Sequence, residues 1–308
     1  MNETPPPHAP TKATTPYEQR SYLDALQLFD AVWAPRLADL VDRLEIESGT
    51  SILEVGAGAG ALSRLLAAAS GSPITVLDRS FAHVEHLNQL RNAHEAPVCH
   101  AVQGDAGNVS VFADDTFDLI IIARTLHAVR DTAVALQEFA RLLKPGGRCV
   151  VIEAAMRPRM FPVFAHPQAP DFEAALEALR LRDFAEERTA PDPDGRAQSM
   201  HEKGWAGLMA DNGFPQVEGW SIWLEHIGSL PPPILRYASH FLEINRQHAE
   251  RTGLERHVID GIFDDLLGPG PLGIAQRADL HFREALAVYI GTSATVSKRG
   301  FSDQSATH

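Results

Sequence analysis

The segment ILEVGAGAGALSRLLAAA, residues 52–69, joins an apolar run to a helical one through a turn that holds three glycines. The apolar run predicts a buried strand, and the part from Ala61 onward predicts a helix. Glycines in such a turn let the backbone bend tightly and approach a ligand, and the first N–H groups of the helix then face it. The segment therefore predicts a site for a nucleotide-like cofactor, with a glycine turn needed only for packing as the alternative.

The alternation of strand and helix continues on the C-terminal side of this segment. Helical patterns at 80–92 and 131–143 separate further apolar runs, which are 74–78, 98–105, 117–123 and 148–154. Strands that are so continuously apolar are buried on both faces, which is typical of a parallel sheet with helices on each side. The sequence predicts an α/β fold with a doubly wound, mostly parallel sheet.

The remaining chain divides by composition and periodicity. Residues 1–16 are rich in proline and predict a disordered arm. Pro35 is expected to split the helical pattern that follows into two helices. The predicted segments are a helical cap (17–48), the cofactor-binding core (49–155), an insertion (156–200), a helix and strand completing the core (201–228), a mostly helical segment (229–282), a final strand that reads nearly as well as a helix (283–293) and a flexible tail (294–308).

The composition excludes several classes of protein. The 40 Asp and Glu against 27 Lys and Arg give a formal net charge of −13, which disfavours nucleic acid and anionic membranes as partners. No apolar run approaches the ~18 residues that a membrane helix needs. The N-terminus has no apolar signal region, so we expect a cytoplasmic protein. Cys99 and Cys149 lie in apolar runs without a CxxC spacing, and we interpret both as inert core thiols.

Carboxylates end the first three predicted strands. Asp78 follows Glu54 by 24 positions, where a carboxylate can accept hydrogen bonds from both hydroxyls of a ribose. Asp105 follows Asp78 by 27 positions and could accept a hydrogen bond from an adenine amine, or serve only as a turn residue. The carboxyl ends of parallel strands are where open sheets bind ligands, so these groups should lie at one edge.

Two further stretches complete a set of ordered motifs, FDLIIIARTLHAV (117–129) and LLKPGGRCVVIEA (142–154). With them, the block 51–155 resembles the class I S-adenosylmethionine-dependent methyltransferases, and among these the ubiquinone and menaquinone methylases. The resemblance implies a seven-stranded Rossmann-like sheet, S-adenosylmethionine as the cofactor, and methyl transfer to a small molecule such as a secondary metabolite or quinone-like compound. It also implies that the segment 229–282 is a helical lid that determines substrate specificity.

The resemblance also implies roles for individual residues. Asp78 would hold the ribose, Arg79 could stack on the adenine, and Arg124 would border the cofactor. The methionine part would lie against Glu54, Gly56, Ala57, Gly58 and Gly60, and the adenine against Gly104, Asp105 and Ala106. A carboxylate beside the glycine turn suits a cofactor with an ammonium and a sulfonium, and would repel the pyrophosphate of a dinucleotide.

Two residues are candidates for catalysis. His127 follows the fourth strand and could act as a general base, although it could equally line the pocket or contact a loop. Glu153 ends the fifth strand at the same edge of the sheet and could be a base, a substrate contact or a helix cap. No metal is predicted, because His83 and His86 share a helix with no carboxylate placed to complete a site.

Three functions remain open from the sequence. The first is methyl transfer to an O, N, C or S nucleophile of a small molecule, and the absence of Asn/Asp-Pro-Pro-Tyr after the fourth strand disfavours base amines and glutamine as acceptors. The second is S-adenosylmethionine binding with other chemistry, such as cyclisation. The third is a nicotinamide-dependent oxidoreductase, because Gly56, Gly58 and Ala61 also satisfy the dinucleotide fingerprint. A homodimer is left open.

Overall fold

The computed structural model describes residues 16–92, 99–161, 165–167, 172–178, 203–251 and 256–294. Except for Pro16 and Ala294, the predicted N-terminal arm and C-terminal tail lie outside these ranges, as does most of the predicted insertion at 156–200.

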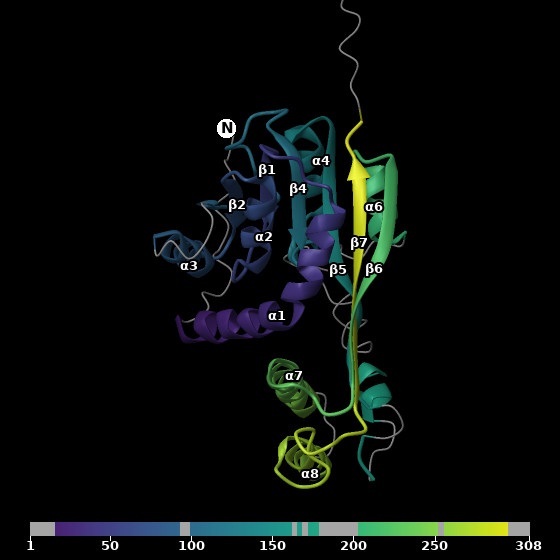
Figure 1. The fold of residues 1–308 in the computed structure, drawn as a ribbon. Coiled ribbons are helices and arrows are strands. Elements are labelled where there is room, and N and C mark those ends of the chain that lie inside the picture. Colours follow the sequence, from purple (N-terminus) through teal and green to yellow (C-terminus); the bar gives the residue numbers. More distant parts are fainter. Residues whose placement is uncertain are drawn as a thin grey trace, which may run out of the picture.

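One seven-stranded sheet forms the centre of the molecule (Figure 1). Its strands are β1 (Ile52–Val55), β2 (Ile74–Asp78), β3 (Cys99–Gln103), β4 (Phe117–Ala123), β5 (Leu143–Arg159), β6 (Gln216–Ile227) and β7 (His281–Thr292). Their order is β3-β2-β1-β4-β5-β7-β6, and only β7 runs antiparallel to its neighbours. This confirms the predicted α/β fold with a mostly parallel sheet, and the segment that read as either strand or helix is β7.

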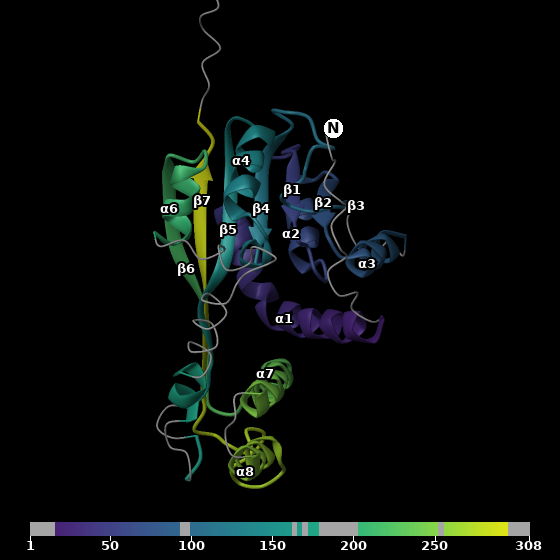
Figure 2. The same ribbon diagram turned by 180° about the vertical axis from the view of Figure 1, so that it is seen from behind.

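Helices cover both faces of the sheet (Figures 1 and 2). The longer helices are α1 (Pro16–Arg43), α2 (Ala61–Ser70), α3 (Phe81–Asn92), α4 (Thr132–Leu142), α6 (Gly204–Asp211), α7 (Pro232–Arg251) and α8 (Arg256–Leu267), and η1 (Leu126–Ala128) is one turn of 3-10 helix. Side chains of β1 alternate between the two layers: Ile52 packs in the cluster with α1 and α2, whereas Leu53 and Val55 pack in the cluster with α4 and α6. This two-sided burial explains why the parallel strands are apolar throughout.

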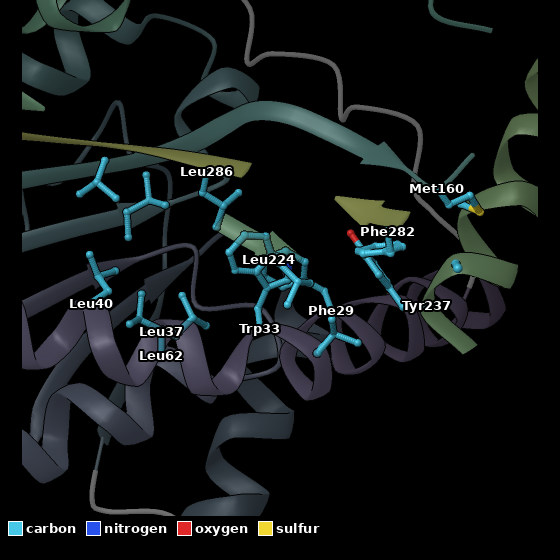
Figure 3. Close-up of a cluster of buried hydrophobic side chains, with 14 of the residues drawn as sticks. Phe29, Trp33, Leu37, Leu40, Leu62, Met160, Leu224, Tyr237, Phe282 and Leu286 are labelled. Carbon is cyan, nitrogen blue, oxygen red and sulfur yellow. The ribbon is translucent and has the colours of Figure 1, made fainter. Parts of the chain in front are cut away.

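The helix α1 is continuous through Pro35, so the prediction of two helices is wrong. Proline removes one backbone donor and bends a helix, and Figure 1 shows α1 bending along its length. Buried side chains on both sides of Pro35, including Trp33 and Leu37, pack on the strands (Figure 3). That packing holds both halves of α1 against the sheet despite the missing hydrogen bond.

Three strands, β5, β6 and β7, extend well beyond the rest of the sheet, and β6 pairs with β7 as far as Ile227 and His281. The pairing of β5 with β7 continues as far as Arg159 and Arg283, and α7 and α8 lie beside this extension (Figure 1). Among the described helices, none combines the length and the apolar character that crossing a membrane requires. Both cysteines are buried, and burial raises the pKa of each thiol, which fits core positions.

Candidate functional site

A cavity of about 700 Å³ opens at the carboxyl ends of β1, β2 and β4, between the glycine turn and α1. The sequence-predicted residues on its wall are Glu54, Gly56, Ala57, Gly58, Asp78, Arg79, Gly104, Asp105, Ala106, Arg124 and His127. The other two predicted residues, Gly60 and Glu153, lie outside the lining. The structure thus brings almost the whole predicted set together at one edge of the sheet.

The glycines of the turn adopt conformations that other residues rarely take. Gly56, Gly58 and Gly60 have φ values of +76°, +55° and +87°. A Cβ on Gly56 would clash with the side chain of Thr125, and a Cβ on Gly58 would lie 3.1 Å from Leu26 Cδ1 of α1. The backbone of the glycine turn therefore lies close to the loop after β4 and to α1. Glycines fit at these positions because they have no Cβ atom.

Glu54 and Asp30 give the cavity one buried and one partly buried carboxyl group. Glu54, 1% exposed, accepts a hydrogen bond from Ser63 Oγ of α2. Burial raises its pKa to about 8, and the nearby charges of Asp30 and Asp78 act in the same direction. Asp30 of α1 accepts a hydrogen bond from the Ala61 amide at 3.1 Å, and burial raises its pKa to about 6. Both groups favour a cation in the cavity, since a positive charge would stabilise their ionised forms.

Asp78 is fixed by three donors at the end of β2. Its Oδ1 accepts from the Ser80 amide at 2.8 Å, and its Oδ2 lies 3.2 Å from His83 Nδ1 and 3.4 Å from the Gly58 amide. Asp78 is therefore a carboxylate partner of His83 from outside its helix, which the sequence did not indicate. Among the described residues, however, no three His, Cys, Asp or Glu side chains gather as a metal site would require.

The residues that follow β2 and β3 line the part of the cavity beside these two strands. The Gly104 amide donates to the Asp78 carbonyl at 3.0 Å, which holds the two strand ends together. Asp105 Oδ1 accepts from the Gly107 amide at 2.8 Å, so this carboxylate has the turn role that the sequence left open. Its Oδ2 has no hydrogen-bond partner among the described residues. Arg79 is exposed and Ala106 is buried.

Arg124 takes a strained backbone conformation directly after β4. Its φ of +50° is unusual for a residue other than glycine, and its amide donates to the Ile152 carbonyl of β5 at 2.7 Å. The guanidinium carbon lies 3.8 Å from the centre of the Phe29 ring of α1, a cation–π contact. Arg124 thus adds a positive group to the cavity wall, close enough to Asp30 for its charge to favour the ionised carboxylate.

His127 and Glu153 form a pair. The Nδ1 of His127 lies 2.9 Å from Glu153 Oε2, and the His127 amide donates to Oε1 at 3.1 Å. The His127 side chain is 56% exposed, whereas that of Glu153 is 5% exposed. When Glu153 accepts from Nδ1–H of a neutral imidazole, Nε2 keeps its lone pair. This is the arrangement that a general base needs.

Several residues of the site were not predicted. Asp30, Phe29 and Leu26 line the cavity from α1, and His83 and Thr125 line it from the core. Asp30 has a signal in the sequence, because it interrupts the apolar stripe of α1 at helical spacing from Leu26 and Trp33. Its meaning depends on what packs against α1, which the spacing does not reveal. No described residue of the predicted lid at 229–282 lies on the wall; Leu286 of β7 does.

The donor set fits the cofactor that the resemblance implies. S-adenosylmethionine carries a sulfonium and an ammonium, and the cavity offers the carboxyl groups of Glu54, Asp30 and Asp78 close to the glycine turn. The same groups would repel the pyrophosphate of a nicotinamide dinucleotide.

Comparison with known proteins agrees with this geometry. A family model described as a methyltransferase domain matches residues 53–151. A demethylmenaquinone methyltransferase of Mycobacterium marinum is 32% identical over 201 residues, which are 62% of this chain and 80% of that protein. A 2-phytyl-1,4-naphtoquinone methyltransferase of Thermosynechococcus vestitus is 35% identical over 133 residues, 43% of this chain and 54% of that protein.

A solved structure shows the same fold. It is that of a Bacillus halodurans protein described as a methyltransferase, which superposes with a TM-score of 0.51 at 16% identity and covers 84% of this chain and 99% of its own. Taken with the sequence relatives, this means that the chain belongs to the class I S-adenosylmethionine-dependent methyltransferases, in the group of the quinone methylases.

Proposed function

We propose that this enzyme transfers the methyl group of S-adenosylmethionine to a quinone-like small molecule that loses a proton during the reaction. The observation that carries the proposal is His127 on the cavity wall, held by Glu153 from outside the lining, with Nε2 of His127 free of partners among the described residues. The base suits an acceptor with an O–H, an N–H or a C–H made acidic by a neighbouring carbonyl or hydroxyl. A thioether or tertiary amine would have no use for it.

The transfer is an in-line displacement. When bound, S-adenosylmethionine supplies a methyl group on a sulfonium that leaves as a neutral thioether. The acceptor atom forms its new bond to the methyl carbon as the S–C bond breaks, the bonding pair passes to sulfur, and the acceptor proton passes to Nε2 of His127. The protein contributes geometry and the exclusion of water, because the leaving group is already good.

Residues of the wall divide between cofactor and acceptor in this proposal. Asp78 holds the ribose hydroxyls, Asp105 and Ala106 border the adenine, and Glu54 with the glycine turn borders the methionine part. The apolar side chains of Phe29, Leu37, Ile152 and Leu286 are left for the acceptor. A flat, apolar ring system fits such a surface.

The quinone-like character of the acceptor is supported by the names of the relatives. The Mycobacterium marinum protein is a demethylmenaquinone methyltransferase and the Thermosynechococcus vestitus protein acts on a naphthoquinone. A reduced naphthoquinone carries hydroxyl groups and an activated ring carbon next to them, so it offers the acidic proton that His127 would remove.

A panel of acceptors tests the proposal. Purified enzyme would be incubated with S-adenosylmethionine and a reduced naphthoquinone lacking one ring methyl, a simple phenol, a thioether or a tertiary amine, and products would be measured by mass spectrometry. We expect a methylated naphthoquinone or phenol and an equal amount of S-adenosylhomocysteine. Methylation of the thioether or amine alone would contradict the proposal, and turnover without S-adenosylhomocysteine would favour non-methylating chemistry.

A further inference from the structure

We propose that Asp30, on the cap helix α1, is a cofactor-binding residue that holds the ammonium group of the methionine part of S-adenosylmethionine together with Glu54. The inference requires only the cofactor, so it holds or fails independently of the acceptor. Asp30 lies on α1, outside the ordered motifs of the core, and would be an additional residue of the cofactor site.

The geometry places Asp30 of α1 against the start of α2, on the wall of the cavity. Its Oδ2 accepts a hydrogen bond from the Ala61 amide at 3.1 Å, which ties α1 to the residue that follows the glycine turn. The side chain lines the cavity, and Oδ1 has no hydrogen-bond partner among the described residues. One oxygen thus positions the group, and the other is available to a ligand.

The charges around Asp30 match the amino-acid end of the cofactor. The carboxylate of Glu54 on β1 is close enough to that of Asp30 for the two to repel each other when both are ionised. Asp78 of β2 also repels the ionised Glu54. Arg64 of α2 and Arg124 after β4 act on Asp30 in the opposite sense. An amino acid is a zwitterion, so its ammonium would relieve the Asp30–Glu54 repulsion while its carboxylate finds positive charge near Arg124.

The raised pKa values of the two carboxyl groups support a cationic occupant. Burial raises the pKa of Asp30 to about 6 and that of Glu54 to about 8 in the protein without cofactor. An ammonium between them would favour the ionised forms, so the cofactor should bind with release of protons. The adenosine end of the cofactor would not have this effect.

The test compares three ligands that differ in charge. S-adenosylmethionine has the ammonium and the sulfonium, S-adenosylhomocysteine has only the ammonium, and 5′-methylthioadenosine has neither. The variant Asp30→Asn keeps an oxygen that can accept from the Ala61 amide but removes the charge. Asp24→Asn is the matched control, because Asp24 is an exposed acid of the same helix and does not line the cavity.

Calorimetry should show that Asp30→Asn weakens S-adenosylmethionine and S-adenosylhomocysteine by a similar factor, about 10- to 100-fold for a lost charged hydrogen bond. Binding of 5′-methylthioadenosine should stay unchanged, as should all three affinities in Asp24→Asn. Unchanged affinity for S-adenosylmethionine would overturn the inference. A loss confined to S-adenosylmethionine would assign Asp30 to the sulfonium instead, and an equal loss for all three ligands would mean that Asp30 acts only in folding.

A second measurement uses the wild-type enzyme and does not depend on the variant folding. Binding heats in buffers of different ionisation enthalpy give the number of protons released. We expect S-adenosylhomocysteine to release more protons at pH 5 than at pH 7, because Asp30 is protonated at the lower pH only. Glu54 alone, with a pKa of about 8, would release about the same number at both, and that result would overturn the inference.

Discussion

Glu153 accepts two hydrogen bonds from His127 at once, one from the imidazole Nδ1 at 2.9 Å and one from the backbone amide at 3.1 Å. The first bond fixes the tautomer and the ring orientation, and the second fixes the turn η1 that carries the side chain. The expectation that Glu153 ends its strand is wrong, because β5 continues to Arg159. Glu153 lies within β5 just beyond the end of β4, and His127 follows β4, so two neighbouring strands together aim one nitrogen at the cavity. Glu153 therefore acts as a positioning residue in this account.

Replacing Glu153 should reduce the rate without changing cofactor binding. Glu153→Gln keeps the size of the side chain and one acceptor oxygen, but its amide nitrogen cannot accept from Nδ1. The imidazole then loses its fixed tautomer, and we expect kcat to fall about 10- to 100-fold. Steady-state kinetics and calorimetry check this, with Glu138→Gln as a control on α4. A kcat equal to that of the wild type would remove Glu153 from the mechanism.

Asp78 should contribute to cofactor affinity. The substitution Asp78→Asn keeps a side chain that can be held by the Ser80 amide, but it removes the charge that two ribose hydroxyls would donate to. The affinity for S-adenosylmethionine should fall about 10- to 100-fold. Fluorescence titration of both proteins measures this, and titration with NADH should show no saturable binding. Equal affinities of variant and wild type would contradict the role given to Asp78.

The cofactor-free protein should lose stability as the pH rises from about 4.5 to 8. In this window the Glu54 carboxyl is ionised in the unfolded chain but still protonated in the folded one, since burial raises its pKa from 4.5 to about 8. The unfolded state then binds fewer protons, and the free energy of unfolding falls by up to about 1.4 kcal/mol for each pH unit.

Thermal unfolding at several pH values measures this effect. On the order of 2 °C in Tm corresponds to each kcal/mol, so the decline should be visible in the wild type and smaller in Glu54→Gln. S-adenosylhomocysteine should raise Tm more at pH 8 than at pH 6, because it favours the ionised carboxylate. A decline that is identical in Glu54→Gln would mean that another group causes it.

A buried carboxyl group on β7 should stabilise the contact between α1, α7 and the sheet. Glu284 accepts hydrogen bonds from Trp33 Nε1 at 2.9 Å and from Tyr237 Oη at 3.0 Å, and all three side chains are buried. Glu284→Ala leaves two buried donors without an acceptor, which should lower the free energy of unfolding by about 2–4 kcal/mol.

Urea denaturation of Glu284→Ala tests this, with Tyr237→Phe as the milder comparison. Tyr237→Phe removes one donor together with its bond, so we expect a loss of about 1 kcal/mol. If the two variants were equally stable, or if Glu284→Ala matched the wild type, the contact would have no such role.

The sequence allowed the prediction of those parts of the site that depend on local chain structure. The carboxylates at the ends of β1 and β2 and the histidine after β4 follow strands whose parallel arrangement sends their ends to one edge. Asp30 could not be assigned in this way, because its role depends on the packing of α1 against α2. The same is true of Pro35, where packing on both sides keeps one helix that the local preference of proline would divide.

The pairing of His127 with Glu153 could not be predicted from the sequence either. Both residues were candidates for a base, and nothing in their spacing showed that one would bind the other. Only the register of β4 beside β5, which pairs Ala123 with Ile152, brings Glu153, the next residue of β5, into contact with the turn that follows β4.

The central claim is that His127 removes the acceptor proton during methyl transfer, and single-turnover transfer by His127→Gln tests it most directly. The variant and the wild type would be saturated with methyl-labelled S-adenosylmethionine and mixed with a reduced naphthoquinone acceptor, with His100→Gln as an exposed control on β3. We predict equal cofactor affinity in all three proteins and a transfer rate about 10²- to 10⁴-fold lower in His127→Gln only. A His127→Gln rate equal to the wild-type rate, with cofactor bound, would contradict the account.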